Sequence, residues 1–517
     1  MNSFRIKNTK AFLDSDEINI KPITILVGQN SCGKSSLLRF PAVLAQTANN
    51  FGSTPPVSLF GENVDYGNFQ DIVYGKNGNE ISFSLCYSVD ITGNTQVSTD
   101  PGGTRLMVKR RKTNGQVSEQ VFKDATISVT LRWSNRSINV HSVDMSIEEY
   151  PVSSLCWNEE KKQYILSLLS MYENNELIRV NETIVLSSEY VSFEKFFPIY
   201  EGDVLEAILS SNNLELSMDQ KRSILKYHLF QSVKADIKND LSETELKMAR
   251  VYSIFEFSAD IMRSLYCSFN IECKNNIAYI GPFRKNPDRI YRSSEAIKLH
   301  VGAKGENMAD ILARAYRADD KTLYDKISEL IEDYFGYKLI INDLGSNFFQ
   351  VMLKDQSGLE ANLIDVGFGI SQVLPIILET CLSSEKKQKR TADLGINNII
   401  LVEQPELHLH PAAQARLAEL FAMCVNANPN ARFIIETHSE HLISKLQVLI
   451  ADIECPLNSD MVQILYVDKD DQGCAFVEEM RIKENGKFEK EWPTGFFDQG
   501  YSLAKQLMRV SSQRGKK

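Results

Sequence analysis

One nine-residue segment near the start of the chain combines the residue types that hold phosphate groups. It consists of Gly28, Gln29, Asn30, Ser31, Cys32, Gly33, Lys34, Ser35 and Ser36. Glycines let backbone N–H groups converge on phosphate oxygens, the lysine supplies a cation for the β- and γ-phosphates, and the first serine can ligate Mg²⁺. An apolar run at 23–27 precedes the segment and helix-favouring residues at 37–40 follow it, which is the order that such a loop requires. We therefore expect all nine residues to bind ATP, with Ser35 on the metal.

A later apolar run ends in a residue that can complete a phosphate site. The run 399–402 is followed directly by Glu403, in the form of a Walker B strand. Because ligands of α/β proteins bind at the carboxyl ends of the strands, we expect Glu403 to lie beside the phosphate loop and to hold the metal. Another run, 433–435, leads into Glu436-Thr437-His438-Ser439. Such runs alternate with helical patterns, for example at 412–424, and this predicts an α/β fold with a mostly parallel sheet.

The middle of the chain has a different pattern. Short alternating runs occupy about 80–190, and Asn77-Gly78 and Asn114-Gly115 are candidates for tight hairpin turns. Helical patterns follow at 220–235 and 243–267. No heptad series is sustained over several repeats, so we do not expect a long coiled-coil arm. A basic cluster at 105–112 could track a nucleic-acid backbone, or it could be a solvated hairpin.

Composition narrows the class of protein. The chain has 517 residues, 43% of them hydrophobic and 24% charged, which is typical of a soluble globular protein. The formal net charge of −10 argues against a nucleic-acid coat protein. No apolar run approaches the ~18 residues of a membrane span, and the N-terminus does not have the pattern of a signal peptide. The nine cysteines include no CxxC pair. We therefore expect a cytoplasmic protein with no membrane contact, no disulfide framework and no zinc ribbon.

Several segments carry a family resemblance. The stretch Glu403-Gln404-Pro405-Glu406-Leu407-His408-Leu409-His410-Pro411 resembles the (D/E)xPExHLHP stretch of the overcoming-lysogenization-defect (OLD) class of ABC-type ATPases. That class is related to the RecF-like, Rad50 and SMC heads of recombination and chromosome maintenance. Further segments resemble the same class: 365–373 its signature, 436–439 its switch-histidine segment, 280–284 and 305–307 other parts of the head, and 492–498 a small tail domain. The resemblance covers about 1–85 and 275–505.

The resemblance implies a fold and a subunit arrangement. It implies an ABC-type P-loop ATPase head, interrupted by a mixed β and helical insertion. In such heads the signature segment starts a helix that faces the γ-phosphate bound by the other subunit, so Gly369 and Ser371 would contact ATP across a homodimer or a higher homo-oligomer. His438 would sense the γ-phosphate. The expected division is 1–85 and 275–480 for the two parts of the head, 86–274 for the insertion, and 481–517 for a small extension.

The sequence offers two candidates for the residue that activates water. In most relatives a glutamate follows the Walker B acid, but here the residue is Gln404. A neutral amide cannot accept a proton as a general base, although it can orient water. Glu406 is the other candidate. The candidate catalytic set is therefore Glu403, Gln404, Glu406 and His438, and we expect slow hydrolysis.

The resemblance also implies a biological setting. Nucleases of the OLD class carry a Toprim domain after the ATPase, and the residues after His438 are too few for one. The chain then resembles stand-alone ATPases of anti-phage systems such as Septu, PARIS and the retron-associated kind. These work with a separately encoded effector, a nuclease or a toxin. Two alternatives remain: a RecF-like repair ATPase that binds DNA directly, and an ATP-binding scaffold with little turnover.

Overall fold

The structure is a computed structural model. It describes residues 1–50, 55–76, 78–91, 95–99, 106–110, 112–113, 116–117, 121–173, 176–200, 204–212, 214, 216–229, 241–294, 296–385 and 397–493. The chain divides into two compact units. One, the parallel-sheet unit, contains Ile20–Ala42, Gly61–Asp65 and Asn275–Lys517; the other, the antiparallel-sheet unit, contains Met1–Asn19, Val43–Phe60 and Tyr66–Lys274.

The parallel-sheet unit is built on a six-stranded sheet. Its order is β17 (Ile277–Ile280), β22 (Asn398–Glu403), β23 (Ala431–Glu436), β4 (Ile23–Gly28), β24 (Val462–Lys469) and β25 (Ala475–Glu479). The first five strands pair in parallel, and β24 pairs with β25 antiparallel. Every residue of β22 and β4 is buried, because helices cover both faces of a parallel sheet and demand apolar side chains. The strands predicted at 23–27, 399–402 and 433–435 are thereby confirmed.

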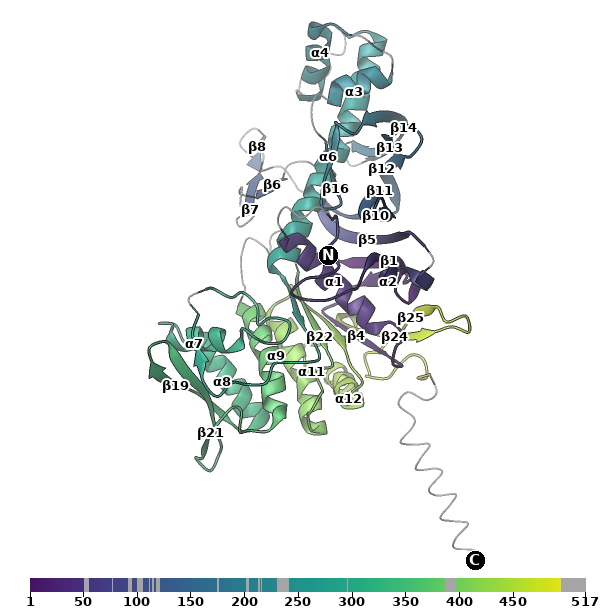
Figure 1. The fold of residues 1–517 in the computed structure, drawn as a ribbon. Helices are drawn as coiled ribbons and strands as arrows, with labels where there is room; N and C mark the ends of the chain where they lie inside the picture. The colour runs from purple at the N-terminus through teal and green to yellow at the C-terminus, as the bar shows by residue number, and fades with distance from the viewer. Residues whose placement is uncertain are drawn as a thin grey trace, which may run out of the picture. The chain divides into compact units, whose positions relative to one another are not determined.

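Helices and a smaller sheet complete this unit. The helices are α7 (Met308–Arg317), α8 (Thr322–Phe335), α9 (Phe368–Glu385), α11 (Pro411–Ala427) and α12 (Glu440–Ala451). One continuous core joins them to the large sheet, and Figure 1 shows α9, α11 and α12 beside β22 and β4. The smaller sheet contains β18 (Tyr291–Arg292), β19 (Lys338–Gly345), β20 (Phe348–Lys354) and β21 (Glu360–Asn362).

The antiparallel-sheet unit is built on nine strands. They are β1 (Ser3–Thr9), β2 (Phe12–Asp14), β3 (Ile18–Asn19), β5 (Glu80–Asp90), β10 (Phe122–Ser134), β11 (Ser137–Ile147), β12 (Tyr150–Asn158), β13 (Gln163–Glu173) and β14 (Glu176–Ser187). All their pairings are antiparallel. A mostly parallel sheet is therefore not confirmed for the chain as a whole. It describes the sheet that carries the phosphate loop, whereas hairpin connections force antiparallel pairing in the larger sheet.

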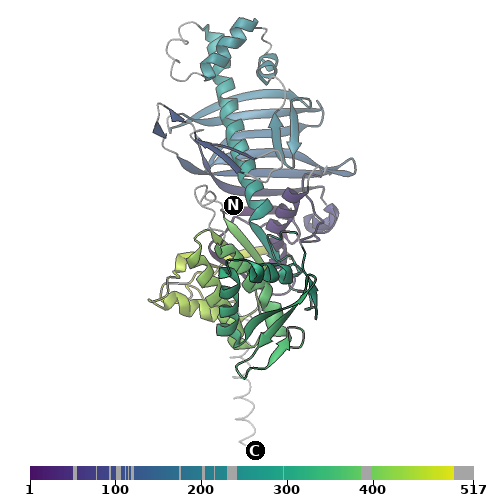
Figure 2. The ribbon, with the colours of Figure 1, turned by 90° about the vertical axis from the view of Figure 1, so that its left-hand side faces the viewer.

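One long helix packs on the nine-stranded sheet. Helix α6 (Glu243–Asn275) crosses its strands in Figure 2, and Ser258 Oγ lies 2.9 Å from Ser153 Oγ of β12. Phe196 and Phe269 meet edge to face with ring centres 5.1 Å apart, so the helix packs against the turn between the later strands β15 (Val191–Glu194) and β16 (Phe197–Tyr200). The remaining elements of this unit are α2 (Phe69–Ile72), η1 (Tyr74–Lys76), β6 (Thr95–Thr99), β7 (Leu106–Arg110), β8 (Lys112–Thr113), β9 (Gln116–Val117), β15 (Val191–Glu194), β16 (Phe197–Tyr200), α3 (Val204–Ser211) and α4 (Met218–Leu229).

The helices and the two compact units can be compared with the membrane and domain predictions. Among the helices in the described ranges, none has the length and apolar character that a bilayer span requires. The two compact units do not follow the four ranges expected from the sequence, since β1 to β3 pair with the antiparallel sheet. The division into 1–85, 86–274, 275–480 and 481–517 stays a prediction.

Candidate active site

The phosphate loop lies at the carboxyl end of β4, directly before helix α1 (Lys34–Asn49). Gly28 has a φ of +140°, and a Cβ at this position would lie 1.9 Å from the Val467 carbonyl oxygen, so only glycine fits. The Lys34 side chain is buried and folds back over the loop. Its Nζ donates to the carbonyl oxygens of Gly28, at 3.0 Å, and Gln29, at 2.6 Å. The ammonium group is thus held at the mouth of the loop, where phosphate oxygens would replace those carbonyls as its partners.

Cys32 contributes to the loop as a small buried side chain. Its Sγ donates to the Gln29 carbonyl oxygen at 2.9 Å, and burial raises the pKa of the thiol. A raised pKa disfavours the reactive thiolate. Cys32 therefore supports the loop rather than offering a redox centre.

A carboxylate from the neighbouring strand reaches the loop serine. Ser35 Oγ donates a hydrogen bond of 2.7 Å to Glu436 Oε2, at the end of β23. Glu436 is 5% exposed, and burial raises the pKa of its carboxyl, against the opposing effects of the Ser35 hydrogen bond and the Lys34 cation. The sequence drew attention to Glu403 as the acid beside the loop, but the strand adjacent to β4 is β23, so Glu436 is closer in the sheet order.

Glu403 is held by two other side chains. Arg39 of α1 donates to both of its oxygens, from Nε at 2.6 Å and from a terminal nitrogen at 2.8 Å, and the Tyr279 hydroxyl donates to Oε1 at 2.8 Å. Glu403 is 2% exposed. The hydrogen bonds to Glu403 raise the pKa of Arg39, and burial beside this carboxylate raises the pKa of Tyr279. Arg39 thus pairs its positive charge with a buried carboxylate.

These residues suit a divalent cation. Mg²⁺ prefers oxygen ligands and is usually held by one or two carboxylates together with substrate phosphates. The Ser35 hydroxyl, the Glu436 carboxylate and, on the next strand, the Glu403 carboxylate supply that set. The donor chemistry therefore fits the metal that accompanies ATP, with Ser35 at its centre.

Glu406 and His438 lie together at the same edge of the sheet. Glu406 accepts hydrogen bonds from Thr437 Oγ1, at 2.8 Å, and from the His438 backbone N–H, at 2.7 Å. Burial raises the pKa of Glu406, whereas desolvation and the nearby Lys34 cation lower the pKa of His438. The result is an acid with increased basicity next to an imidazole that favours its neutral form. Glu406 and His438 therefore stay candidates for water activation and phosphate sensing, respectively.

Gln404 sits in a backbone turn that Arg284 stabilises. Gln404 has a φ of +44°, and its N–H donates to the Glu436 carbonyl oxygen at 2.7 Å. The Arg284 guanidinium is 6% exposed and donates to the carbonyl oxygens of Glu403, at 2.8 Å, and Gln404, at 3.2 Å. Desolvation lowers the pKa of Arg284 to about 10. Arg284 therefore fixes the turn that carries the candidate base.

The segment expected to be the signature packs against this same turn. A Cβ on Gly369 would lie 3.3 Å from the His408 carbonyl oxygen, so the missing side chain lets the start of α9 approach the loop after β22. A Cβ on Gly367 would meet open space. Ser371 is 4% exposed, so its side chain lies inside the unit rather than on its surface. The structure thus brings Gly369 beside the Walker B loop of its own chain.

Other predicted residues take lesser places. His410 caps α11, with its Nδ1 accepting from the Ala412 N–H at 3.4 Å, and His408 is exposed with a φ of +63°. Among the described residues, no group of three or more His, Cys, Asp or Glu side chains could hold a metal ion. Three predicted features lie wholly or partly outside the described part of the chain. They are the side chains of the basic cluster at 105–112, the two turns (Asn77 of the first and all of Asn114-Gly115), and residues 494–498 of the tail.

Three residues of the site were not expected as such from the sequence. Arg39, Tyr279 and Glu436 all surround the two acids at the ends of β22 and β23. Glu436 carried a usable signal, because it ends a buried strand in the same way as Glu403. Arg39 and Tyr279 carried none, since their contacts join segments far apart in the chain.

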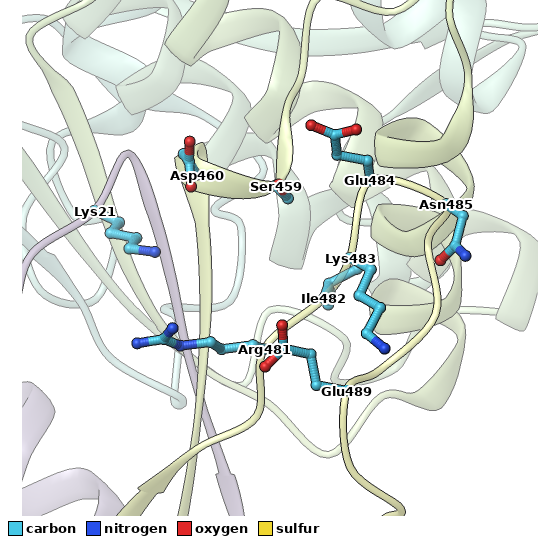
Figure 3. A pocket seen from close by; sticks show the side chains of 9 residues that line it. All are labelled: Lys21, Ser459, Asp460, Arg481, Ile482, Lys483, Glu484, Asn485 and Glu489. Atoms are coloured by element: carbon cyan, nitrogen blue, oxygen red, sulfur yellow. The ribbon is translucent and has the colours of Figure 1, made fainter.

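A pocket near the end of the described chain is a separate feature. It has a volume of about 660 Å³ and is lined by Lys21, Ser459, Asp460, Arg481, Ile482, Lys483, Glu484, Asn485 and Glu489, as Figure 3 shows. Lys21 precedes β4 and Asp460 precedes β24, so this pocket lies at the amino ends of those strands. The phosphate loop lies at the opposite, carboxyl end. The pocket is therefore not the phosphate site.

Comparisons with known proteins give the following similarities. The SMC head domain from Thermotoga maritima is 9% identical over 93% of this chain and 99% of that chain, with a TM-score of 0.34. An Smc head domain with an extended coiled coil from Pyrococcus furiosus, bound to the C-terminal domain of ScpA, is 11% identical over 93% of this chain and 96% of that chain, with a TM-score of 0.38. No curated protein matched the sequence. Residues 457–507 match the model described as Protein of unknown function (DUF3696). The AAA ATPase domain model (AAA_15) matches residues 1–443, which is most of the sequence, and the chain therefore belongs to this ATPase family.

Proposed function

We propose that this protein is an ABC-type ATPase that binds ATP with Mg²⁺ at the phosphate loop and hydrolyses it slowly. One observation carries the proposal. The carboxyl edge of a single sheet brings together the loop residues Lys34 and Ser35, the acids Glu403, Glu436 and Glu406, and His438. Membership of the AAA ATPase domain family supports it. Nucleotide and metal at this edge would meet a cation, a hydroxyl, carboxylates and a neutral imidazole.

Each side chain has a role that follows from its chemistry. Lys34 pairs with the β- and γ-phosphates, Ser35 and Glu403 are on the metal side, and Mg²⁺ when bound would neutralise the charge that develops on the phosphates. Glu406 lies where a basic carboxylate can take a proton from water, and His438 lies within one residue of the Thr437 hydroxyl that holds Glu406. Gln404, an amide, orients water without accepting its proton.

Slow turnover follows from this arrangement. The residue directly after the Walker B acid is the amide Gln404, and the alternative base Glu406 is already held by two hydrogen bonds. We infer that ATP serves partly as a ligand that drives subunit assembly. An ATP-binding scaffold with little turnover is therefore the second candidate function. A turnover above roughly 10 s⁻¹, the median for enzymes, would contradict slow hydrolysis.

Association of two copies is the second part of the proposal. The start of α9 lies beside a segment that exposes apolar side chains, with Ile290 49% and Ile364 42% exposed. Arg289 binds Asp365 through two hydrogen bonds of 2.7 and 2.9 Å, and Asn362 donates to the Arg289 carbonyl oxygen, so the two stretches form one surface. Exposed apolar side chains on such a surface favour protein contacts. A second copy whose bound γ-phosphate meets the start of α9 would cover it.

The biological role that we propose is control of a separately encoded effector, a nuclease or a toxin, in bacterial anti-phage defence. It is supported by the resemblance of the 403–411 stretch to the OLD class and by the acidic net charge of −10, which favours a protein partner over direct DNA binding. Salt-dependent binding of duplex DNA by the protein alone would favour the RecF-like alternative instead.

The experiment that tests the ATPase assignment compares three proteins. Wild type, Lys34→Ala and the matched control Lys338→Ala, which removes an exposed lysine of β19, are assayed for ATP binding by calorimetry and for phosphate release. We expect Lys34→Ala to lose both signals and Lys338→Ala to keep both. If Lys34→Ala bound ATP like wild type, the site assignment would be wrong.

A further inference from the structure

The order of the strands places an unassigned acid nearer to the phosphate loop than the Walker B acid. Glu436 ends β23, which pairs directly with β4, whereas Glu403 ends β22, one strand further from the loop. Neighbouring strands are about 4.8 Å apart. Glu403 and Glu436 are register partners, so the two acids lie side by side at the ends of neighbouring strands. The difference of one strand in their distance from β4 therefore decides which carboxylate can reach a metal beside the loop.

The observed contacts separate the two acids. Ser35 Oγ, the hydroxyl that a phosphate loop offers to Mg²⁺, donates to Glu436 Oε2 at 2.7 Å. Both oxygens of Glu403 are instead engaged by Arg39, at 2.6 and 2.8 Å, and one of them also accepts from Tyr279. A cation at Glu403 would have to compete with the permanently charged Arg39 guanidinium. A cation at Glu436 would replace a single neutral hydroxyl contact with an ionic one.

We propose that Glu436 is the carboxylate that holds the divalent cation beside Ser35, and that Glu403 acts on the site through Arg39. This inference rests on the proposed ATP site and moves the metal carboxylate of that site from Glu403 to the neighbouring Glu436. The Ser35 hydroxyl and the Glu436 carboxylate then form one side of the cation site, and the nucleotide phosphates form the other. Arg39 and Glu403 form a neighbouring ion pair that keeps β22 and α1 in place.

The test measures metal binding rather than turnover. The full-length protein is titrated with ATP in the presence of Mn²⁺ and in its absence, and bound Mn²⁺ is followed by electron paramagnetic resonance. The variants are Glu436→Gln, Glu403→Gln and the control Glu440→Gln, which changes an exposed acid at the start of α12. We expect Glu436→Gln to weaken Mn²⁺ binding at least about tenfold while metal-free ATP binding persists, and we expect the control to match wild type.

The outcomes are distinguishable. Wild-type Mn²⁺ affinity in Glu436→Gln, together with its loss in Glu403→Gln, would overturn this inference and leave the ATP site intact. Absence of ATP binding by wild type would instead remove the proposed function.

A measurement on wild type covers the case in which Glu436→Gln does not fold. Fe²⁺ with ascorbate and ATP cleaves the backbone near bound metal, and we expect cuts beside Ser35 and Glu436. Cuts beside Glu403 without any beside Glu436 would contradict the inference.

Discussion

Arg39 holds the buried Glu403 carboxylate through two hydrogen bonds of 2.6 and 2.8 Å. Because Glu403 is 2% exposed, removal of Arg39 leaves a charge in the core with Tyr279 as its remaining donor. We expect Arg39→Ala to lower the free energy of unfolding by roughly 3 kcal/mol, the lower part of the range for a broken buried pair, since Arg39 itself is partly exposed. Thermal denaturation without nucleotide measures the effect.

The chain offers a matched control for this variant. Arg289 binds Asp365 with the same two-bond geometry, but both side chains are about half exposed. Arg289→Ala should therefore change the free energy of unfolding far less than Arg39→Ala does, because solvent screens an exposed ion pair. The double variant Arg39→Ala with Glu403→Gln should recover part of the loss. Equal melting temperatures for Arg39→Ala and wild type would contradict the account of this pair.

Glu406→Gln should separate binding from hydrolysis. The variant keeps Lys34, Ser35 and both strand-end acids, so ATP affinity should stay within a few-fold of wild type. If Glu406 accepts the proton of water, phosphate release should fall by about 10² to 10⁴. Single-turnover assays with radiolabelled ATP are sensitive enough to measure this loss.

The companion variant is Gln404→Glu, which restores a carboxylate directly after Glu403. We expect it to raise turnover, because a base then stands in the position that is usual in the resembled class. Unchanged hydrolysis in Glu406→Gln would assign the water to another group.

The pH dependence of hydrolysis follows from two pKa shifts of opposite direction. Burial raises the pKa of Glu406, and a base must be ionised, so the rate should fall as the pH decreases through that raised value, above the ordinary 4.5. Desolvation lowers the pKa of His438 below the usual histidine value of 6.5, so most of the imidazole is neutral at pH 6.5. The acidic limb of the rate profile should thus persist in His438→Gln. If the acidic limb disappears in His438→Gln, the titrating group is the histidine and not Glu406.

His300 is expected to stabilise the helix that follows the signature segment. Its Nδ1 lies 2.8 Å from Glu379 Oε1 of α9, and its Nε2 lies 3.0 Å from the Asn275 carbonyl oxygen. Glu379 is fully buried and also accepts from the Val301 N–H. His300→Leu should cost roughly 2 kcal/mol, because it removes the imidazole hydrogen bond to a buried carboxylate.

Thermal melts of His300→Leu and of His441→Leu, which changes an exposed histidine of α12, provide the comparison. A fall in melting temperature confined to His300→Leu supports the assignment. Equal melts for the two variants would show that the Glu379 contact contributes little.

Local patterns predicted the strands of the parallel sheet and the phosphate loop, because a buried strand followed by Gly-x-x-x-x-Gly-Lys-Ser has few other structures available. Such local patterns could not predict which side chains contact Glu403 and Glu436. Strand order decides that Glu436 rather than Glu403 meets Ser35, and strand order depends on how distant segments pair. Arg39 and Glu403 lie 364 positions apart in the chain, so no local spacing relates them.

The contact made by Gly369 at the start of α9 also depends on how distant segments pack. Gly369 looked suited to close approach by a phosphate, and its close neighbour in the structure is the His408 carbonyl oxygen of the same chain. The glycine was recognised from the sequence, but its contact required the fold. The antiparallel sheet likewise takes β1 to β3 from the very start of the chain, which the pattern of the middle segment did not indicate.

We propose that ATP binding at the phosphate loop joins two copies of the chain. Light scattering coupled to size exclusion, with Mg²⁺ and with or without ATP, tests it most directly. We predict that the wild-type mass doubles or rises further with ATP, that Lys34→Ala stays at the mass seen without ATP, and that Lys338→Ala behaves like wild type. A wild-type mass that is the same with and without ATP, or ATP-dependent association of Lys34→Ala, would contradict the account.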